Sequence, residues 1–416
     1  MTDATVSLTT DDGKPLKAAL AASLAVRRRR ALLLVLPLFL FIVVTFIWPI
    51  GQMLVQSFHN DSFSASAPAL GDWFSEHPQG AAIDESAYAA LASDLARMKE
   101  EKTAGSAGTR INYDVPGTRS LFTSSARNAD KLKPPFRDAI VALDKKWEDP
   151  NLWRAMRSAS HAYTLDFYLA ALDLTRDADG KIVGVPADQA VYKTLFWRTI
   201  VMSFQITALC LLLGFPIAFL LSAVKMKHAM LLMILVLLPF WTSLLVRTTA
   251  WMVLLQQQGV VNDLLVWLGI LRDDQRLAMM YNQVGTIIAM THILLPFTIL
   301  PLYSVMKTIP PSYVRAARSL GATSWTAFRR VYLPQTLPGV GAGGLLVFIL
   351  AMGYYITPAL VGGADGQMIS NMIAFHMQKS LNWSLAAALS TMLLVIVLVF
   401  FWIYDRLIGI DKMKLG

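Results

Sequence analysis

Long apolar runs separated by polar stretches dominate this chain of 416 residues. Six of the runs reach the roughly 20 residues that a helix needs to cross a bilayer. We place them at 31–54, 197–223, 229–254, 284–306, 338–360 and 384–407. Some contain proline, such as Pro239 in the third run, which membrane helices tolerate when neighbouring groups satisfy the freed carbonyl oxygens. The pattern predicts an all-α polytopic membrane protein with six transmembrane helices.

One long polar stretch, residues 55–195, separates the first apolar run from the second. Within it a helix is predicted from apolar residues that recur every three to four positions: Tyr88, Leu91, Leu95 and Met98. Residues 61–82 and 103–120 are rich in Ser, Gly, Ala and Pro and are predicted to be loops. We therefore expect a large, partly helical segment outside the membrane between the first and second transmembrane helices.

Charge distinguishes this polar stretch from the rest of the chain. Residues 55–195 carry a net charge of −3 and the remainder +12, which together give the +9 of the whole sequence. Only 16% of all residues are charged, against about 25% in soluble domains. The excess of basic residues lies in short loops beside the apolar runs. We therefore expect the protein to contact a lipid bilayer and not nucleic acid.

The same basic loops predict the orientation, because loops rich in Lys and Arg stay on the cytoplasmic side. Arg27–Arg30 place the N-terminal tail, residues 1–30, inside. Six crossings then put the Arg315–Arg330 loop and the C-terminal tail, residues 409–416, inside as well. The first run is too long for a signal peptide and lacks a small-residue cleavage site behind it. We therefore predict a retained first helix, two cytoplasmic termini and an outward-facing polar stretch.

Catalytic chemistry is not indicated by the sequence. The six His are scattered, so no metal site is predicted. Gly13-Lys14 and Gly180-Lys181 lack the first glycine and the Ser or Thr of a phosphate-binding loop. The single cysteine, Cys210, lies in the second apolar run, which leaves the outer stretch without a disulfide. We expect no catalytic residue, metal or cofactor in this chain.

The segment Arg315–Pro334 reads RAARSLGATSWTAFRRVYLP. Small side chains at Ala316 and Ala317 allow a helix to approach another surface closely, and Gly321 permits a sharp turn. The following helix is expected to end at Leu333-Pro334. The segment resembles the EAA loop of ABC importer permeases, with the pattern EAA, three spacers, Gly, nine spacers and I-x-LP. That loop docks on an ATPase subunit, so the resemblance implies a cytoplasmic coupling loop at 308–337, marked by Arg315, Ala316, Ala317, Gly321, Val331, Leu333 and Pro334.

The glutamate of that pattern is replaced here by Arg315. The chain has no Glu outside residues 55–195, so the carboxylate contact of the family is missing. We expect the docking geometry to be kept with different ion pairing at this corner.

Two further stretches, PFWTSLLVRTTAW at 239–251 and YYITPALVGG at 354–363, resemble the spermidine/putrescine-type subfamily of these permeases. The resemblance covers roughly 31–58 and 160–408. It implies a first helix at 31–54, a periplasmic segment at 55–195 and a five-helix permease core at 196–408. Residues of about 60–155 lie outside the family pattern and are interpreted as an insertion, for which the sequence suggests two roles: contact with a binding protein, or a tolerated surface domain.

Candidate residues of a translocation path lie in the same two stretches: Trp241, Arg247, Trp251, Tyr354, Tyr355 and Thr357. Aromatic faces attract ammonium groups, but Trp and Tyr also gather at membrane interfaces. A charged residue within a span usually faces a cavity or a partner, yet Arg247 could also extend to the headgroups. We keep both interpretations, and favour ion pairing over substrate contact for Arg247 because a cationic solute would repel it.

By resemblance the protein is the permease subunit of a bacterial ABC importer in the inner membrane. The implied partners are a dimer of ATPase subunits that binds ATP and Mg²⁺, a second homologous permease and a periplasmic solute-binding protein. A polyamine such as spermidine or putrescine is the leading solute, and another amino or phosphonate compound is the alternative. A secondary transporter would need carboxylates in its spans, and a membrane sensor would need a larger cytoplasmic output domain than the short tail after Arg406.

Overall fold

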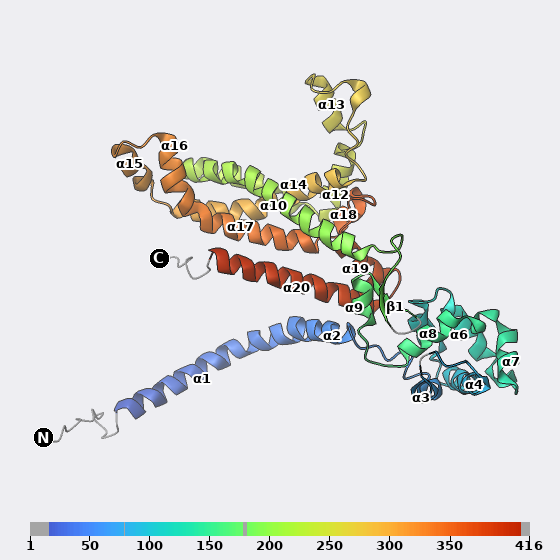
Figure 1. Ribbon diagram of the computed structural model, residues 1–416. Helices are drawn as coiled ribbons and strands as arrows, with labels where there is room; N and C mark the ends of the chain where they lie inside the picture. Colours follow the sequence, from blue (N-terminus) through green and yellow to red (C-terminus); the bar gives the residue numbers. More distant parts are fainter. Residues whose placement is uncertain (1–15, 79, 178–180, 409–416) are drawn as a thin grey trace. The chain divides into compact units, whose positions relative to one another are not determined.

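The computed structural model describes residues 16–78, 80–177 and 181–408, which form two compact units, 1–56 and 57–416 (Figure 1). The first unit is a single long helical run. It consists of α1 (Leu16–Ile42), a π-helical turn η1 (Val43–Ile47) and α2 (Trp48–Gln56). Residues 24–56 of this run are long and apolar enough to cross a membrane, which agrees with the span expected at 31–54.

The second unit begins with short helices and 3-10 turns. They are α3 (Pro68–Glu76), α4 (Glu85–Glu100), α5 (Ala104–Asn112), α6 (Thr118–Arg127), η2 (Ala129–Lys131), α7 (Phe136–Leu143), η3 (Lys145–Glu148) and α8 (Pro150–Ala159). A connecting piece follows, made of α9 (Asp166–Ala171) and the antiparallel pair β1 (Leu174–Arg176) and β2 (Ile182–Gly184).

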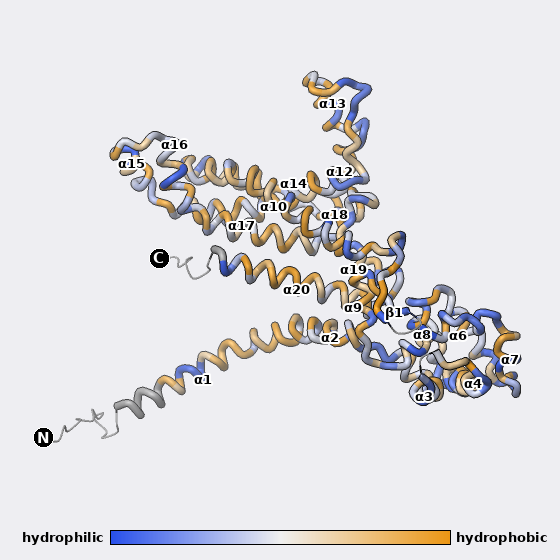
Figure 2. The backbone as a smooth tube through the Cα atoms, viewed as in Figure 1, coloured by the Kyte–Doolittle hydropathy of each residue, from blue (hydrophilic) through white to orange (hydrophobic). Residues whose placement is uncertain are grey.

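The remainder of the second unit is helical and largely apolar (Figure 2). Its long helices are α10 (Tyr192–Ala223), α14 (Gln283–Thr308), α17 (Leu333–Gly353) and α20 (Trp383–Ile408). Between them lie α11 (Met226–Leu237), η4 (Leu238–Trp241), α12 (Leu244–Leu254), α13 (Val260–Trp267), η5 (Asp273–Gln275), α15 (Pro311–Ser319), α16 (Ser324–Ala327), η6 (Phe328–Tyr332), α18 (Ile356–Val361) and α19 (Ile369–Gln378).

Five helices of the described chain are long and apolar enough to span a membrane, or six when one bent pair is taken as a span. The bent pair is the third predicted span. The sequence pattern placed one span at 229–254 with Pro239 inside it, and the structure divides it, because residues 226–241 and 244–254 meet at 97°. Pro239 lies in the 3-10 turn before the break and offers no backbone N–H, and the Ser243 hydroxyl accepts from the Val246 N–H at 3.2 Å to begin α12 afresh.

The fifth span is shifted from its expected position. The sequence pattern placed it at 338–360, whereas the helical run extends from Ser324 to Gly353. The chain leaves the helix at Tyr354, and α18 then starts as a separate short helix at Ile356.

The helices α10, α14 and α17 form the centre of the bundle, where glycines permit close approach. A Cβ atom on Gly343 of α17 would lie 3.1 Å from the backbone oxygen of Thr298 in α14. A Cβ on Gly214 of α10 would lie 3.2 Å from the Thr298 side chain. Small residues of this kind let membrane helices gain packing energy without a hydrophobic driving force.

Residues 63–159, here called the α3–α8 subdomain, have a hydrophobic core of their own. At its centre Trp147 is fully buried, and its carbonyl oxygen accepts from Tyr88 Oη at 3.1 Å and Trp153 Nε1 at 2.7 Å. The helix predicted around Tyr88 is present as α4. The loops expected at 61–82 and 103–120 are wrong in part, because α3 and α5 form there and bury Leu70 and Ile111. Burial has overridden the weak local propensity of Gly, Ser and Pro.

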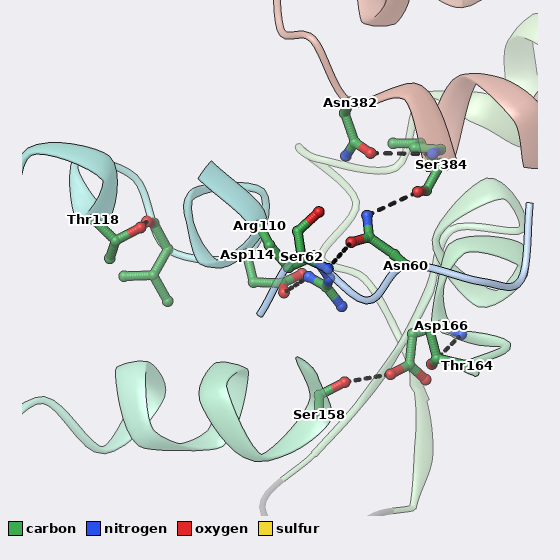
Figure 3. A network of polar contacts seen from close by, with 12 residues as sticks. Asn60, Ser62, Arg110, Asp114, Thr118, Ser158, Thr164, Asp166, Asn382 and Ser384 are labelled. Atoms are coloured by element: carbon green, nitrogen blue, oxygen red, sulfur yellow. Dashed lines mark hydrogen bonds and ion pairs between the residues drawn. The ribbon is translucent and has the colours of Figure 1, made fainter. Parts of the chain in front are cut away.

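The two ends of the α3–α8 subdomain lie side by side. His59 and Tyr163 form an isolated antiparallel bridge, and the Asn60 N–H donates to the Ala162 carbonyl at 2.8 Å. Figure 3 shows the polar contacts at this joint, including Asn60 Nδ2 donating to Ser384 Oγ at 2.9 Å. Tyr113 adds a second contact, from its hydroxyl to the Leu381 carbonyl at 2.8 Å. The subdomain is therefore attached to the corner between α19 and α20, at the end of the bundle opposite α15 and α16 (Figure 1).

Candidate functional site

The segment 311–323 is a short helix that ends in a tight turn. Pro311 occupies its first turn, where no intrahelical N–H is needed. At its end Gly321 has a φ of 90°, and its N–H donates to the Arg318 carbonyl at 3.0 Å. The Ala322 N–H reaches back to the Ala317 carbonyl at 3.0 Å. These two bonds form a Schellman turn, for which glycine is the favoured residue, so the turn expected at Gly321 is present.

The helix after this turn does not end at Leu333-Pro334, so that prediction is wrong. Thr323 caps α16, with its hydroxyl accepting from the Thr326 N–H at 3.2 Å. The chain then continues through the π-helical turn η6 directly into α17, with Leu333 and Pro334 in the first turn of α17. A π-turn changes the hydrogen-bond register, so it can accommodate the N–H that Pro334 lacks within one continuous helix.

Aromatic packing attaches the segment to the bundle. Tyr332 in η6 packs edge-on against Phe219 of α10, with ring centres 5.4 Å apart. Phe328 packs in the same manner on Phe219 at 6.2 Å. Val314 of α15 joins the same cluster, which includes Met306 near the end of α14. A displacement of α15 and α16 would therefore be transmitted to α10 and α14.

The outer surface of the segment combines apolar tips with positive charge. Leu320 is 89% exposed and Trp325 is 68% exposed. Four exposed arginines surround them, and none forms an ion pair with a described residue: Arg315, Arg318, Arg329 and Arg330. Among the sequence-predicted positions, Ala316, Gly321 and Pro334 are also exposed, whereas Ala317, Val331 and Leu333 are half-buried.

The second candidate region is centred on α12, which follows the break in the third span. Thr248 is fully buried there, and its hydroxyl lies 3.1 Å from the hydroxyl of Thr357 in α18. Thr248 also donates to the Leu244 carbonyl at 2.9 Å, so Thr357 is placed to donate to Thr248. This buried pair fixes α12 against α18 and thereby fixes the position of the neighbouring Arg247.

The structure brings three of the predicted path residues together. Trp251 Nε1 donates to His292 Nδ1 of α14 at 3.1 Å, and the two rings meet edge to face. Arg247 is close enough to act electrostatically on both His292 and Tyr354. His292 is thereby held in place as a hydrogen-bonded residue of α14.

Two other predicted path residues stand apart from this group. Trp241 is 75% exposed, at the end of η4 before the break. Tyr355 is exposed, although its carbonyl oxygen accepts from Asn371 Nδ2 at 2.8 Å. The Tyr354 carbonyl is held likewise by Ser370 Oγ at 2.6 Å. Ser370 and Asn371 were missed in the sequence because they bind backbone oxygens, and no spacing pattern marks such contacts.

A cavity of about 350 Å³ lies beside this group, between α10, α11, η4 and α14. Its lining is almost entirely aliphatic, and His292 is the polar exception. No group of three or more His, Cys, Asp or Glu in the described ranges could hold a metal ion. In the part of the chain that the structure describes, this region thus consists of an aliphatic cavity next to a small group of hydrogen-bonded polar side chains.

An all-helical bundle with five or six candidate spans, an exposed turn at one end and a group of polar side chains at a broken helix is the architecture of a polytopic membrane protein. A sequence profile of the family described as "Binding-protein-dependent transport system inner membrane component" matches residues 190–408, and the chain belongs to that family. It is a multi-pass inner-membrane protein, the permease subunit of an ABC importer, and a transport component and not an enzyme. Residues 57–189 lie outside the matched range.

Two curated relatives are permeases with a named solute. The chain is 38% identical over 216 residues to "Spermidine/putrescine transport system permease protein PotB" of Haemophilus influenzae, which covers 52% of this chain and 75% of the relative. It is 33% identical over 250 residues to the protein of the same name from Escherichia coli, covering 59% and 84%. A solved bacterial alginate ABC transporter in complex with its alginate-bound periplasmic protein is 19% identical, with a TM-score of 0.43 over 71% of this chain and 99% of the other.

Proposed function

We propose that this chain forms one half of the transmembrane path of an importer for small amine solutes, with polyamines such as spermidine and putrescine as the solute class. The observation that carries the proposal is the identity of 33–38% to permeases named for these two solutes. The groups around α12 fit it, since Trp251 and Tyr354 supply aromatic faces that attract ammonium ions. Thr248 and Thr357 add hydroxyl oxygens to the same region.

The segment 308–337 is the surface on which an ATPase subunit docks. Two features of the segment support this role. α15 and its Schellman turn are exposed, and η6 is packed on α10. The marked positions are Arg315, Ala316, Ala317, Gly321, Val331, Leu333 and Pro334. The partner is a dimer of ATPase subunits, which binds ATP and Mg²⁺, and its closure moves α15 and the helices packed against it.

The orientation follows from the basic residues. Both termini and the 308–337 loop lie in the cytoplasm, where loops rich in Lys and Arg are retained. The α3–α8 subdomain then lies in the periplasm. Its position at the end of the bundle opposite α15 supports this proposal (Figure 1). There it meets a periplasmic solute-binding protein. A second, homologous permease completes the path.

Uptake of labelled solutes by cells that carry the complete importer tests the solute class. We expect labelled putrescine and spermidine to accumulate and to compete with one another, because both present ammonium groups to the same aromatic faces. A hundredfold excess of aminobutyrate or of an alkylphosphonate should leave this uptake unchanged. If an aminobutyrate or phosphonate accumulates and polyamines do not, the solute class is wrong while the importer assignment stands.

A further inference from the structure

We propose that a carboxylate of the second permease subunit pairs with Arg247 at the break in the third span. This rests on the proposed function, in which two homologous permeases form one path. The pairing would make the outer end of the broken helix an interface between subunits and would remove a positive charge from the route of a cation.

The first argument is that Arg247 forms no ion pair with any residue that the structure describes. Its Nε atom is enclosed by the protein and makes no hydrogen bond to any described residue. The residue as a whole is half-buried. A buried guanidinium nitrogen without a partner is costly, and within a membrane the cost of an unpaired charge is higher still.

The second argument is that none of the described carboxylates forms an ion pair with Arg247. The candidate spans between residues 192 and 404 contain neither Asp nor Glu. The acids that follow α12 already serve other cations, since Asp263 and Asp273 pair with Arg276 at 2.7 and 2.8 Å. Asp405 lies at the far end of α20, beside Arg406. Asp365 is exposed in the turn after α18 and forms no ion pair with Arg247 either. The counter-charge of Arg247 is therefore assigned to another molecule.

The third argument concerns the surroundings of Arg247, which hold it in place. The Thr248–Thr357 pair fixes its helix, and Trp251 with His292 forms a hydrogen-bonded wall next to it. All of these neighbours are uncharged hydrogen-bonding or aromatic groups. They hold Arg247 in position but do not neutralise its positive charge. The non-helical backbone at 242–243 must also be covered by another surface, because irregular backbone at membrane depth is tolerated only against protein or water.

The source of the carboxylate follows from charge. An amine solute would be repelled by an unpaired Arg247, so the solute cannot supply the anion. A protein carboxylate across the subunit boundary satisfies the guanidinium with bidentate geometry and leaves the aromatic faces free for the solute.

Charge reversal in the complete importer tests this pairing with two measurements, co-purification of the second permease and uptake of labelled putrescine. We expect Arg247→Glu to lower both at least tenfold, since two carboxylates would then face each other. Arg247→Lys should retain part of both. The matched control is Lys193→Met, which removes a positive charge from an exposed position of α10 and should change neither.

Rescue identifies the partner group. In the Arg247→Glu background, each Asp and Glu predicted to lie in the spans of the second permease is changed to Lys, one at a time. We expect one such change to restore co-purification and uptake together. The proposal is overturned if Arg247→Glu assembles and transports normally, or if no single reversal restores assembly. It is also overturned if assembly is intact and only transport of a solute with an anionic group is lost. Co-purification does not depend on the solute, so a wrong solute class would leave this test valid.

Discussion

At the scale of single residues, a few positions need one particular residue type, because of the backbone conformation or the charge at that position. Gly321 is one of these, because its φ of 90° lies in the left-handed region. No atom lies within 4 Å of the position where a Cβ would be built, so the requirement is one of backbone conformation and not of space. Other residues pay about 1–2 kcal/mol for that conformation.

This requirement gives a prediction for Gly321→Leu. The strained turn should open, misplace α15 relative to α16, and lower both uptake and stimulated ATPase activity of the assembled importer at least tenfold. Membrane insertion and yield should stay normal, because the site is exposed. Gly321→Asn is the matched variant, since Asn adopts left-handed conformations most readily after Gly, and it should retain at least half of the activity. Normal uptake by the leucine variant would remove 308–337 as the coupling loop.

Residue-scale prediction from the sequence worked where a residue type has one dominant physical reason. Gly321, separated by nine residues from Val331-Tyr332-Leu333, indicated a turn, and the turn is there. The same reasoning failed at Pro334, because a proline can either end a helix or occupy the first turn of one, and the π-turn that decides between them leaves no mark in the sequence. The hydrogen bonds of Ser370 and Asn371 could not be anticipated, since their acceptors are carbonyl oxygens brought close only by the fold.

At the scale of elements, the molecule depends on caps supplied by distant side chains. Asp94 in α4 illustrates this, because its carboxylate accepts from the backbone N–H groups of Ala69 and Leu70 at the start of α3, at 3.1 and 2.8 Å. The side chain is only 1% exposed. Burial raises its pKa to about 6, although the two hydrogen bonds oppose the rise. The Asp94 carboxyl, which caps the start of α3, therefore titrates close to neutral pH.

The raised pKa predicts the direction of a pH effect on stability. In the unfolded chain the carboxyl would ionise near 3.8, so the folded form binds a proton more tightly between pH 4 and 6. The contribution of Asp94 to the free energy of unfolding is then complete below about pH 4 and is lost as the pH rises through 6. Its magnitude is about 3 kcal/mol at most.

Thermal unfolding of the full chain in detergent, with and without Asp94→Asn, measures this effect. The amide does not titrate, so the Tm of the variant should improve relative to wild type as the pH is raised from 4.5 to 7.5. Ser93→Ala, at an exposed and uncharged position of the same helix, is the control, and the difference between its Tm and that of wild type should change little with pH. A relative Tm of the Asn variant that falls with rising pH would contradict the raised pKa.

Element prediction was most successful for long apolar runs and least successful at their interruptions. The positions of α10, α14 and α20 agree with their hydropathy pattern, because a span needs little beyond length and composition. The 97° bend could not be read from the same pattern, since Pro239 is one of several prolines in the spans and Pro216 lies within an unbroken α10. Only the packing around each proline decides whether the helix breaks.

At the scale of the whole molecule, the chain consists of a permease bundle and an additional helical body. The α3–α8 subdomain has its own buried core. It meets the bundle at Tyr113, whose hydroxyl donates to the Leu381 carbonyl and whose ring packs against the cluster that includes Phe167 and Leu385. The sequence indicated that this stretch was separate, through its charge and its position outside the family pattern. Its compactness was not predictable, because Ala, Gly and Ser in α5 bury as readily as they form loops.

We expect the α3–α8 subdomain to recruit the periplasmic binding protein. Replacement of residues 61–161 by a short Gly/Ser bridge can join Asn60 to Ala162, whose backbone atoms already share a hydrogen bond of 2.8 Å. Uptake at low concentrations of the binding protein should then fall at least tenfold, whereas basal ATPase activity of the assembled complex should persist. Uptake at saturating binding protein serves as the internal control and should be largely retained.

The alternative is a surface domain that is tolerated because long insertions cost little entropy. Unchanged uptake over the full range of binding-protein concentrations would leave only that alternative. Because the deletion also removes the Tyr113 contact to Leu381, the Tm of the complex is measured in parallel. A large loss of Tm would assign the effect to support of the α19–α20 corner, and recruitment would be rejected.

The bridge between His59 and Tyr163 has a consequence for how such a protein could have arisen. A body that leaves and rejoins a chain at adjacent residues can be gained, lost or exchanged without rerouting the helices on either side. The ancestral permease would have needed only a short turn at this place, and a single insertion in the gene would have supplied the rest. Any compact domain whose ends lie equally close together could occupy the same position, which makes this joint a natural site for grafting a reporter or a different recognition module.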